Sequence, residues 1–276
     1  MANLPATQKL VLEEDDGWLT IWFNSPENRN ALSSELTAEL RAVLAAVRDD
    51  RTVRGITFRG KGGVFCAGGD LKGFRTGLQG SGSGHADVVA SSRAGGEMFA
   101  EIDTLPQVVV MLVEGAAMAG GLGMVCCGDV VAVTRDAKFA LTETTLGIAP
   151  AQIAPYVVQR LGLTTSRRLM LTAARFDGEE AGRIGLADHV AEDAAGLDAY
   201  EQEIRRQVTR CAPGANAITK EIVLAAPRLD REAMIDFAAE GFARCMLSDE
   251  GREGIGAFVE KRKPVWANAQ MVKDKS

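Results

Sequence analysis

Histidine is scarce in this chain, and its scarcity excludes several kinds of active site. The 276 residues include only two histidines, His85 and His189. Two separated histidines disfavour both a zinc site and a Ser-His-Asp triad. The five cysteines are odd in number and scattered without a C-x-x-C pair. This pattern favours reduced, mostly buried thiols over a disulfide framework or a metal site.

Long apolar runs and a cationic leader are also absent. No stretch approaches the roughly 18 apolar residues that a membrane-spanning helix needs. The first ten residues, MANLPATQKL, lack a charged region followed by an apolar core, so no secretory signal is visible. We therefore expect a cytoplasmic protein with no membrane partner. The net charge of −6 also argues against a nucleic-acid partner, because surfaces that bind nucleic acid are usually basic.

Two widespread enzyme motifs are missing as well. No G-x-G-x-x-G occurs, which disfavours an NAD-dependent enzyme. Gly80–Gly84 (GSGSG) has the wrong register for the G-x-S-x-G of a serine hydrolase and lies in a loop by composition. The remaining composition, 46% hydrophobic and 25% charged, is that of a soluble globular protein long enough for one large domain or a domain with an appendage.

Short apolar segments that alternate with amphipathic ones predict an α/β architecture for the first part of the chain. Ser33 or Ser34 is a helix cap that precedes an apolar stripe at helical spacing. Gln107–Val113 is almost continuously apolar, which is typical of a strand covered on both faces. The expected strands are Leu19–Phe23, Gly55–Phe58, Val64–Cys66, Gln107–Val113, Val130–Thr134 and Lys138–Leu141, and the expected helices here are Val88–Thr104 and Ala154–Leu161.

The last part of the chain has only helical periodicity. The expected helices are Leu197–Arg210, Ala215–Ala226, Asp230–Leu247 and Ser248–Glu260. We therefore place a boundary near residue 195, between an α/β core (residues 1–195) and a helical C-terminal region (residues 196–276).

Two glycine-rich segments are the most informative feature present. Phe65–Lys72 (FCAGGDLK) and Glu114–Asp129 (EGAAMAGGLGMVCCGD) each follow a short apolar run and end in residues that can open a helix. Glycine at such a junction lets a ligand approach the backbone and its free N–H groups closely. Two junctions in one domain can direct two N–H donors at a single oxygen, as in an oxyanion hole. For either segment alone, ordinary turn glycines are the favoured interpretation.

The order of the polar and glycine-rich segments adds a more specific signal. From about residue 8 to residue 266 the chain resembles the crotonase, or enoyl-CoA hydratase/isomerase, superfamily. The segments that carry the resemblance are Asn28–Leu32 (NRNAL), Phe65–Lys72, Gly115–Asp129, Phe139–Pro150 (FALTETTLGIAP), Arg175–Asp188 (RFDGEEAGRIGLAD) and Phe258–Trp266 (FVEKRKPVW). The resemblance implies a spiral of ββα units, a helical C-terminal trimerisation region, and a homotrimer or dimer of trimers. It also implies an acyl-CoA substrate bound in a bent shape, with coenzyme A as part of the substrate and no separate cofactor or metal.

The same resemblance assigns roles to individual positions. Gly69 and Gly120 match the two oxyanion donors, and Ala67 matches the residue whose backbone meets the adenine. The remaining positions assigned to the substrate or its CoA portion are Arg29, Lys72, Gly121 and Lys261, the last of these from a neighbouring position or subunit.

The catalytic carboxylates depart from the family pattern. Hydratases of this family use two glutamates, and this chain keeps the second as Glu143 but has Gly123 in place of the first. Without the resemblance, the sequence favours a capping or surface role for Glu143 over a catalytic one. Glu114 offers a spare carboxylate, although a glutamate at a strand end is more often solvated.

Three activities remain open for a site with one glutamate. The chain is a hydratase that works with Glu143 alone, a Δ3,Δ2-enoyl-CoA isomerase, or an enzyme of another reaction in the superfamily. A non-catalytic acyl-CoA binder is a further alternative. The run from GGLGM to Ala151–Val158 (AQIAPYVV) resembles members that hydrate 3-substituted glutaconyl-CoA esters, either methylglutaconyl-CoA or isohexenylglutaconyl-CoA, which favours the hydratase. Ala151–Val158 fits the lining of a branched-chain pocket and ordinary helix packing equally well.

Overall fold

A parallel sheet forms the centre of the molecule. The structure is a computed structural model, and it describes residues 3–70, 73 and 84–267. Over these residues the sheet has the strand order β1-β2-β3-β4-β6-β9, and the neighbouring pairs are parallel except for the antiparallel pair β1–β2. Its strands are β1 (Leu10–Asp15), β2 (Trp18–Phe23), β3 (Gly55–Gly60), β4 (Val108–Val113), β6 (Val130–Thr134) and β9 (His189–Ala191).

A smaller sheet lies beside the first and contains part of the second glycine-rich segment. Its strands are β5 (Ala116–Met118), β7 (Lys138–Ala140) and β8 (Phe176–Asp177), with β5 parallel to β7. Other regular elements of the core are η1 (Pro26–Asn28), η2 (Lys61–Gly63), α4 (Gly120–Val125), η3 (Glu143–Leu146), α5 (Ala154–Thr172) and α6 (Gly178–Arg183).

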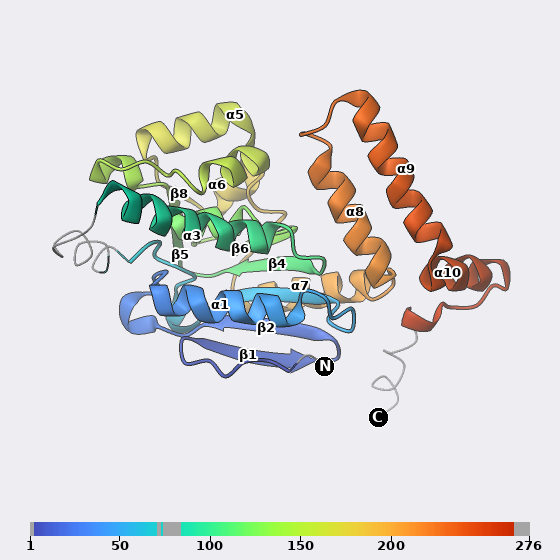
Figure 1. The fold of residues 1–276 in the computed structure, drawn as a ribbon. Coiled ribbons are helices and arrows are strands. Elements are labelled where there is room, and N and C mark those ends of the chain that lie inside the picture. The colour runs from blue at the N-terminus through green and yellow to red at the C-terminus, as the bar shows by residue number, and fades with distance from the viewer. Residues whose placement is uncertain (1–2, 71–72, 74–83, 268–276) are drawn as a thin grey trace.

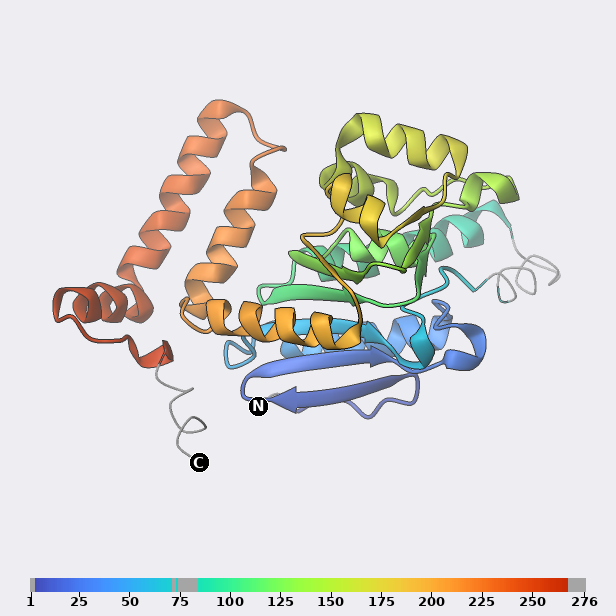
Figure 2. The same ribbon diagram turned by 180° about the vertical axis from the view of Figure 1, so that it is seen from behind.

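Helices cover both faces of the large sheet. α1 (Ser34–Val47) and α3 (His85–Asp103) lie in front of it in Figure 1, and α7 (Ala194–Val208) covers the opposite face in Figure 2. Successive side chains of β4 pack alternately on the two covered faces of the sheet. Met111 and Val113 pack into the larger apolar core, whereas Val110 and Leu112 pack into a second core with Leu197 of α7. The prediction of a strand buried on both faces is confirmed.

Three helices form an arm that projects from the core. α8 (Pro213–Ala225), α9 (Arg231–Leu247) and α10 (Asp249–Val259) pack mainly on one another, and the short η4 (Val265–Ala267) follows them. Both ribbon views place this C-terminal arm on the side of the core away from the start of α3 (Figures 1 and 2). The domain boundary near residue 195 stays a prediction.

Two expectations about single elements need correction. Val64–Cys66 is not a strand, because among the described residues its pairing is limited to one bridge between Cys66 and Ala117. The edge strand β1 was not expected, since LVLEED mixes apolar and acidic residues. The turn Asp16-Gly17, with φ of 48° and 76°, is nevertheless a standard hairpin signal that precedes Trp18. By contrast Ser33 caps α1 as expected, with its side chain accepting from the N–H of Leu36.

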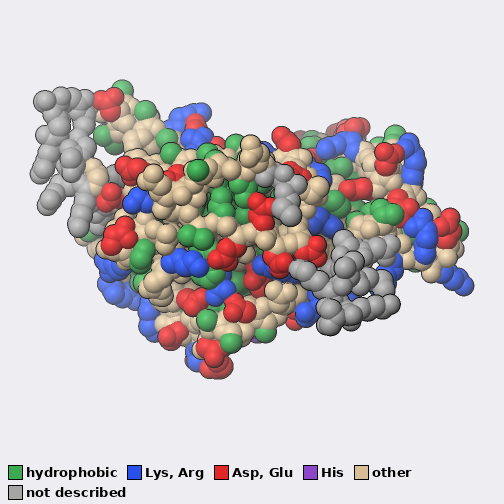
Figure 3. Space-filling model, turned by 90° about the horizontal axis from the view of Figure 1, so that it is seen from below, with side chains coloured by type: hydrophobic (Ala, Val, Ile, Leu, Met, Phe, Trp, Pro, Cys, Tyr) green, Lys and Arg blue, Asp and Glu red, His purple; other side chains and the backbone are tan. Residues whose placement is uncertain are grey.

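The described surface carries charges of both signs. Acidic and basic side chains lie next to one another over the face shown in Figure 3. None of the helices among the described residues combines the length and the hydropathy required to cross a bilayer.

Candidate active site

Three parallel segments end at the same edge of the small sheet: β5, β7 and the segment at Cys66, which is joined to β5 by one bridge. Ala117 of β5 bridges Cys66 on one side, and Met118 pairs with Ala140 of β7 on the other. All three segments run parallel, so their carboxyl ends meet at one edge. Gly69, Gly120 and Glu143 follow within three residues of these pairings. The fold therefore gathers the two expected donors and the expected carboxylate in one place.

The backbone N–H groups of Gly69 and Gly120 border the same small space. An ideal Cβ built on Gly120 would lie 3.8 Å from the backbone nitrogen of Gly69, and one built on Gly68 would lie 3.5 Å from that of Gly120. Across the described part of the chain, neither N–H donates to a protein acceptor. Both glycines are half-exposed. Two adjacent and accessible donors without protein partners can bind one oxygen that carries negative charge.

The backbone around these donors is held in unusual conformations. Ala119 has φ 48° and ψ −120°, a region that residues with a Cβ rarely occupy. Its N–H donates to the carbonyl of Ala140 over 2.8 Å, which anchors the turn that starts α4. Gly68 has φ +95°, and a Cβ there would approach the carbonyl oxygen of Met118 to 2.9 Å. The strain at Ala119, about 1–3 kcal/mol, persists where the surrounding structure fixes it, often at active sites, whereas glycine at residue 68 adopts its positive φ without such a cost.

Apolar side chains surround the second donor. Leu32 Cδ1 lies 3.1 Å and Phe99 Cζ 3.8 Å from the ideal Cβ position on Gly120. The ring of Tyr156 lies 6.1 Å from that of Phe99, centroid to centroid. Low-polarity surroundings strengthen hydrogen bonds to a developing oxyanion.

Glu143 is a buried carboxyl group without a full set of partners. Its exposed fraction is 9%, and among the described residues nothing hydrogen-bonds to its buried Oε2. Burial raises the pKa of Glu143 above the ordinary value of 4.5, while a hydrogen bond from its own backbone N–H opposes the shift. A capping or surface role does not account for a buried, unpaired oxygen. A buried carboxyl group with a raised pKa, at the sheet edge that also holds free N–H donors, is typical of an acid/base group.

The place of the missing glutamate is filled by hydrocarbon. Gly123 is buried one helical turn after Gly120, and an ideal Cβ on it would lie 2.2 Å from Ile153 Cγ2. Real Cβ atoms do not approach other atoms this closely, so no side chain fits at residue 123 while Ile153 keeps its position. The sequence alone could not pair these residues, because they meet only where α4 packs against the start of α5.

Two of the other expected substrate residues lie together. The N–H of Ala67 donates to the carbonyl of Arg29 over 3.0 Å, and Arg29 is held at φ 58° at the end of η1. Asn30 fixes this arrangement from a fully buried position. Its amide donates to the carbonyls of Lys61 and Val64, and its Oδ1 accepts from the N–H of Ser25.

The remaining expected residues do not join this group within one chain. Lys72 lies outside the described residues. Gly121 is buried, and a Cβ on it would lie 2.5 Å from the carbonyl oxygen of Cys66, so its visible role is close packing. Lys261 is exposed and follows α10 in the C-terminal arm, which projects from the core (Figures 1 and 2). Glu114 accepts from the guanidinium of Arg59, so it is paired and not simply solvated.

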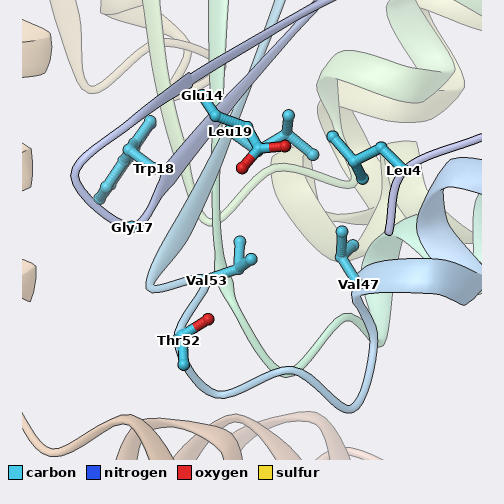
Figure 4. A pocket seen from close by; sticks show the side chains of 8 residues that line it. All are labelled: Leu4, Glu14, Gly17, Trp18, Leu19, Val47, Thr52 and Val53. Atoms are coloured by element: carbon cyan, nitrogen blue, oxygen red, sulfur yellow. The ribbon is translucent and has the colours of Figure 1, made fainter. Parts of the chain in front are cut away.

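A separate hollow lies near the edge strand β1 of the large sheet. Figure 4 shows the residues that line it, which come from the segment before β1, the end of β1, the turn before β2, the start of β2, the end of α1 and the segment before β3. Its lining residues are Leu4, Glu14, Gly17, Trp18, Leu19, Val47, Thr52 and Val53. None of the described residues expected at the active site lines this hollow. Within residues 3–70, 73 and 84–267, no group of His, Cys, Asp and Glu side chains is arranged to hold a metal ion.

Several known proteins are similar to this chain over most of its length. The family model "Enoyl-CoA hydratase/isomerase" matches residues 13–269. The solved structure of Pseudomonas aeruginosa AtuE is 50% identical and superposes with a TM-score of 0.90, covering 94% of this chain and 100% of that one. An enoyl-CoA hydratase/isomerase from Marinobacter aquaeolei is 40% identical, with a TM-score of 0.89, covering 94% and 99%. The mitochondrial methylglutaconyl-CoA hydratase of Mus musculus is 30% identical, covering 91% of this chain and 80% of the mouse protein.

Proposed function

The chain belongs to the enoyl-CoA hydratase/isomerase family and has the crotonase fold, and we propose that it hydrates the α,β double bond of an acyl-CoA thioester with Glu143 as its one acid/base group. The observation that carries this proposal is the meeting of two kinds of group at one sheet edge. The N–H groups of Gly69 and Gly120 have no protein acceptor, and the carboxyl group of Glu143 is buried with one oxygen unpaired.

The proposed reaction uses all of these groups, and Glu143 acts twice, first as a base and then as an acid. The thioester carbonyl oxygen accepts from the N–H groups of Gly69 and Gly120. The Glu143 carboxylate takes a proton from water while the water oxygen bonds to the β-carbon, and the electrons of the double bond move to the carbonyl oxygen. The two N–H groups stabilise the resulting enolate. Protonated Glu143 then gives its proton to the α-carbon, so that one water is added and the carboxylate is restored.

For the acyl group we propose a 3-substituted glutaconyl thioester, of the methylglutaconyl or isohexenylglutaconyl type. The likeness to methylglutaconyl-CoA hydratase at 30% identity supports the class. The apolar surroundings of Gly120, formed by Leu32 and Phe99, suit a branched hydrocarbon substituent. The adenine and phosphates of CoA are proposed to meet Ala67, Arg29 and Lys72, of which the first two adjoin in the structure.

A panel of three thioesters tests the substrate proposal. We expect kcat/KM for 3-methylglutaconyl-CoA or isohexenylglutaconyl-CoA to exceed that for crotonyl-CoA at least tenfold, because one methylene in an apolar pocket changes kcat/KM by about 10-fold or more. The initial rates are measured by loss of the enoyl absorbance. Preference for crotonyl-CoA would contradict the glutaconyl assignment and leave the hydratase assignment intact.

One observation favours an isomerase as the second candidate. The position of a second carboxylate is occupied by Ile153, and moving a proton between two carbons needs a single base. A Δ3,Δ2-enoyl-CoA isomerase would convert a 3-enoyl thioester without taking oxygen from water. A CoA-ester binder without activity would bind the whole panel and convert none of it.

We also propose that the C-terminal arm joins three copies of the chain, as a trimer or a dimer of trimers. Phe258 is 85% exposed and Val259 74% exposed at the end of α10. Phe242 and Leu247 of α9 are exposed as well. Apolar side chains gathered in this way usually mark a protein interface. In such an assembly Lys261 lies close to the interface, from which it can reach CoA held by a neighbour.

Replacing Phe258 by aspartate is expected to dissociate the assembly, because burying an unpaired charge in an apolar contact is costly. Light scattering should show particles of three or six chains for the unmodified protein and the 29.3 kDa chain for the variant. Val88→Asp, at an exposed apolar position of α3 outside the arm, serves as control and should keep the assembly. An unmodified protein that is monomeric at micromolar concentration would contradict the proposal.

A further inference from the structure

Ile153 stands where a side chain on Gly123 would lie, and we propose that it determines which acyl groups the site accepts. This inference rests on the proposed function and adds the residue that sets specificity. The ideal Cβ of Gly123 would lie 2.2 Å from Cγ2 and 2.4 Å from Cβ of Ile153. Ile153 therefore fills the space that the first atoms of a side chain at residue 123 would occupy, against the surface of α4.

This volume faces the donor end of α4. Residues three apart lie on the same face of a helix, so Gly123 lies under Gly120. Cα–Cβ bonds in a helix tilt toward its N-terminus, so a side chain at residue 123 would extend toward the N–H of Gly120. The atoms of Ile153 that occupy this direction thus border the region in which the acyl group is activated.

The backbone of Ile153 is fixed by the helix that it starts. Its carbonyl accepts from the N–H groups of Tyr156 and Val157, each over 3.1 Å, and Pro155 occupies the first turn of α5. Only 4% of Ile153 is exposed, and β-branched side chains have few alternative rotamers. The side chain is a rigid part of the site.

The wall that results consists of hydrocarbon. Leu32 and Phe99 border Gly120 from other elements, and Ile153 extends this apolar lining along α4. A carboxylate placed on this wall would lose its hydration without gaining a donor, which is unfavourable. The wall therefore selects thioesters with a branched hydrocarbon substituent on the β-carbon, and any second carboxylate of the acyl group points elsewhere.

Graded truncation of Ile153 tests this role. The measured quantity is the ratio of kcat/KM for isohexenylglutaconyl-CoA to that for crotonyl-CoA. We expect Ile153→Val to lower the ratio about threefold and Ile153→Ala about tenfold, because each step removes carbon that packs on the branched substituent and not on the short one. The valine variant keeps the β-branched shape, so the test remains available if the alanine variant does not fold.

Ile56→Ala is the matched control. Ile56 is fully buried in β3, near the amino end of that strand, so its truncation lowers stability without reaching the acyl site. Its thermal melting temperature should fall while the ratio stays at the unmodified value. An unchanged ratio in both Ile153 variants, or an equal change in Ile56→Ala, would overturn the role of Ile153. Absence of turnover by the unmodified protein would instead overturn the proposed function itself.

Discussion

Replacing Glu143 by glutamine is expected to lower kcat about 10³-fold while the affinity for the CoA ester changes less than about threefold. The amide keeps the size of the side chain but cannot take a proton from water, and positioned acid/base groups contribute about 10²–10⁴-fold. The loss falls on the chemical step, since in the proposed reaction the thioester is held by backbone donors. Single-turnover kinetics and calorimetric titration with a non-hydratable acyl-CoA measure the two quantities.

The pH profile of the unmodified protein gives an independent check on the same residue. The catalytic form is the carboxylate, so kcat should decline as the pH falls through the pKa of Glu143, which burial raises above 4.5. This acid limb should be missing from the residual activity of Glu143→Gln. Glu114→Gln is a matched control, because Glu114 also follows a strand but is paired with Arg59. We expect it to retain turnover within about threefold.

Replacing Gly120 by alanine should have the second-largest effect, a loss of about 10²–10³-fold in kcat/KM. The added methyl group would lie 3.8 Å from the backbone nitrogen of Gly69, in the space that the carbonyl oxygen needs. Loss of one oxyanion donor typically costs about this factor. The nearest contact of the methyl group is 3.1 Å to Leu32 Cδ1, the flexible end of a side chain. The fold should therefore tolerate the change.

The control for this substitution is Gly95→Ala in α3, where an added Cβ has nothing within 4 Å. Alanine is a better helix former than glycine, so this variant should be at least as stable as the unmodified protein and fully active. Activity of Gly120→Ala within fivefold of the unmodified protein, together with an unchanged melting curve, would show that the reacting oxygen does not occupy the space between the N–H groups of Gly69 and Gly120.

Periodicity and capping chemistry were sufficient to predict most of the core. Gln107–Val113 matches β4 because a strand covered on both faces must be apolar along its whole length. Ser33 could be predicted as the cap of α1 because a stripe of apolar residues at helical spacing follows it, and this stripe is buried in the structure. The glycine-rich segments are informative for a different reason. A side chain would disfavour the positive φ at Gly68 and would prevent the close approach of the chain at Gly121. Glycine at these positions therefore indicates the backbone geometry from the sequence alone.

What could not be predicted depends on contacts between distant segments. No local signal links Gly123 to Ile153, since the clash exists only after α4 and the start of α5 have packed. Asn30 sits in a polar stretch that reads as loop, yet it is fully buried and bonds to Lys61 and Val64. The short strands β8 and β9 have two and three residues, too few for a periodic pattern. These elements follow from the tertiary structure and not from local preference.

The most direct test of one-carboxylate hydration is the origin of the oxygen in the product. The unmodified protein and Glu143→Gln are incubated with a 3-substituted glutaconyl-CoA in ¹⁸O-labelled water, and the product is analysed by mass spectrometry. We predict one ¹⁸O atom in the 3-hydroxyacyl product of the unmodified protein, and product formation about 10³-fold slower in the variant. A product without ¹⁸O, or equal rates for the two proteins, would contradict the account.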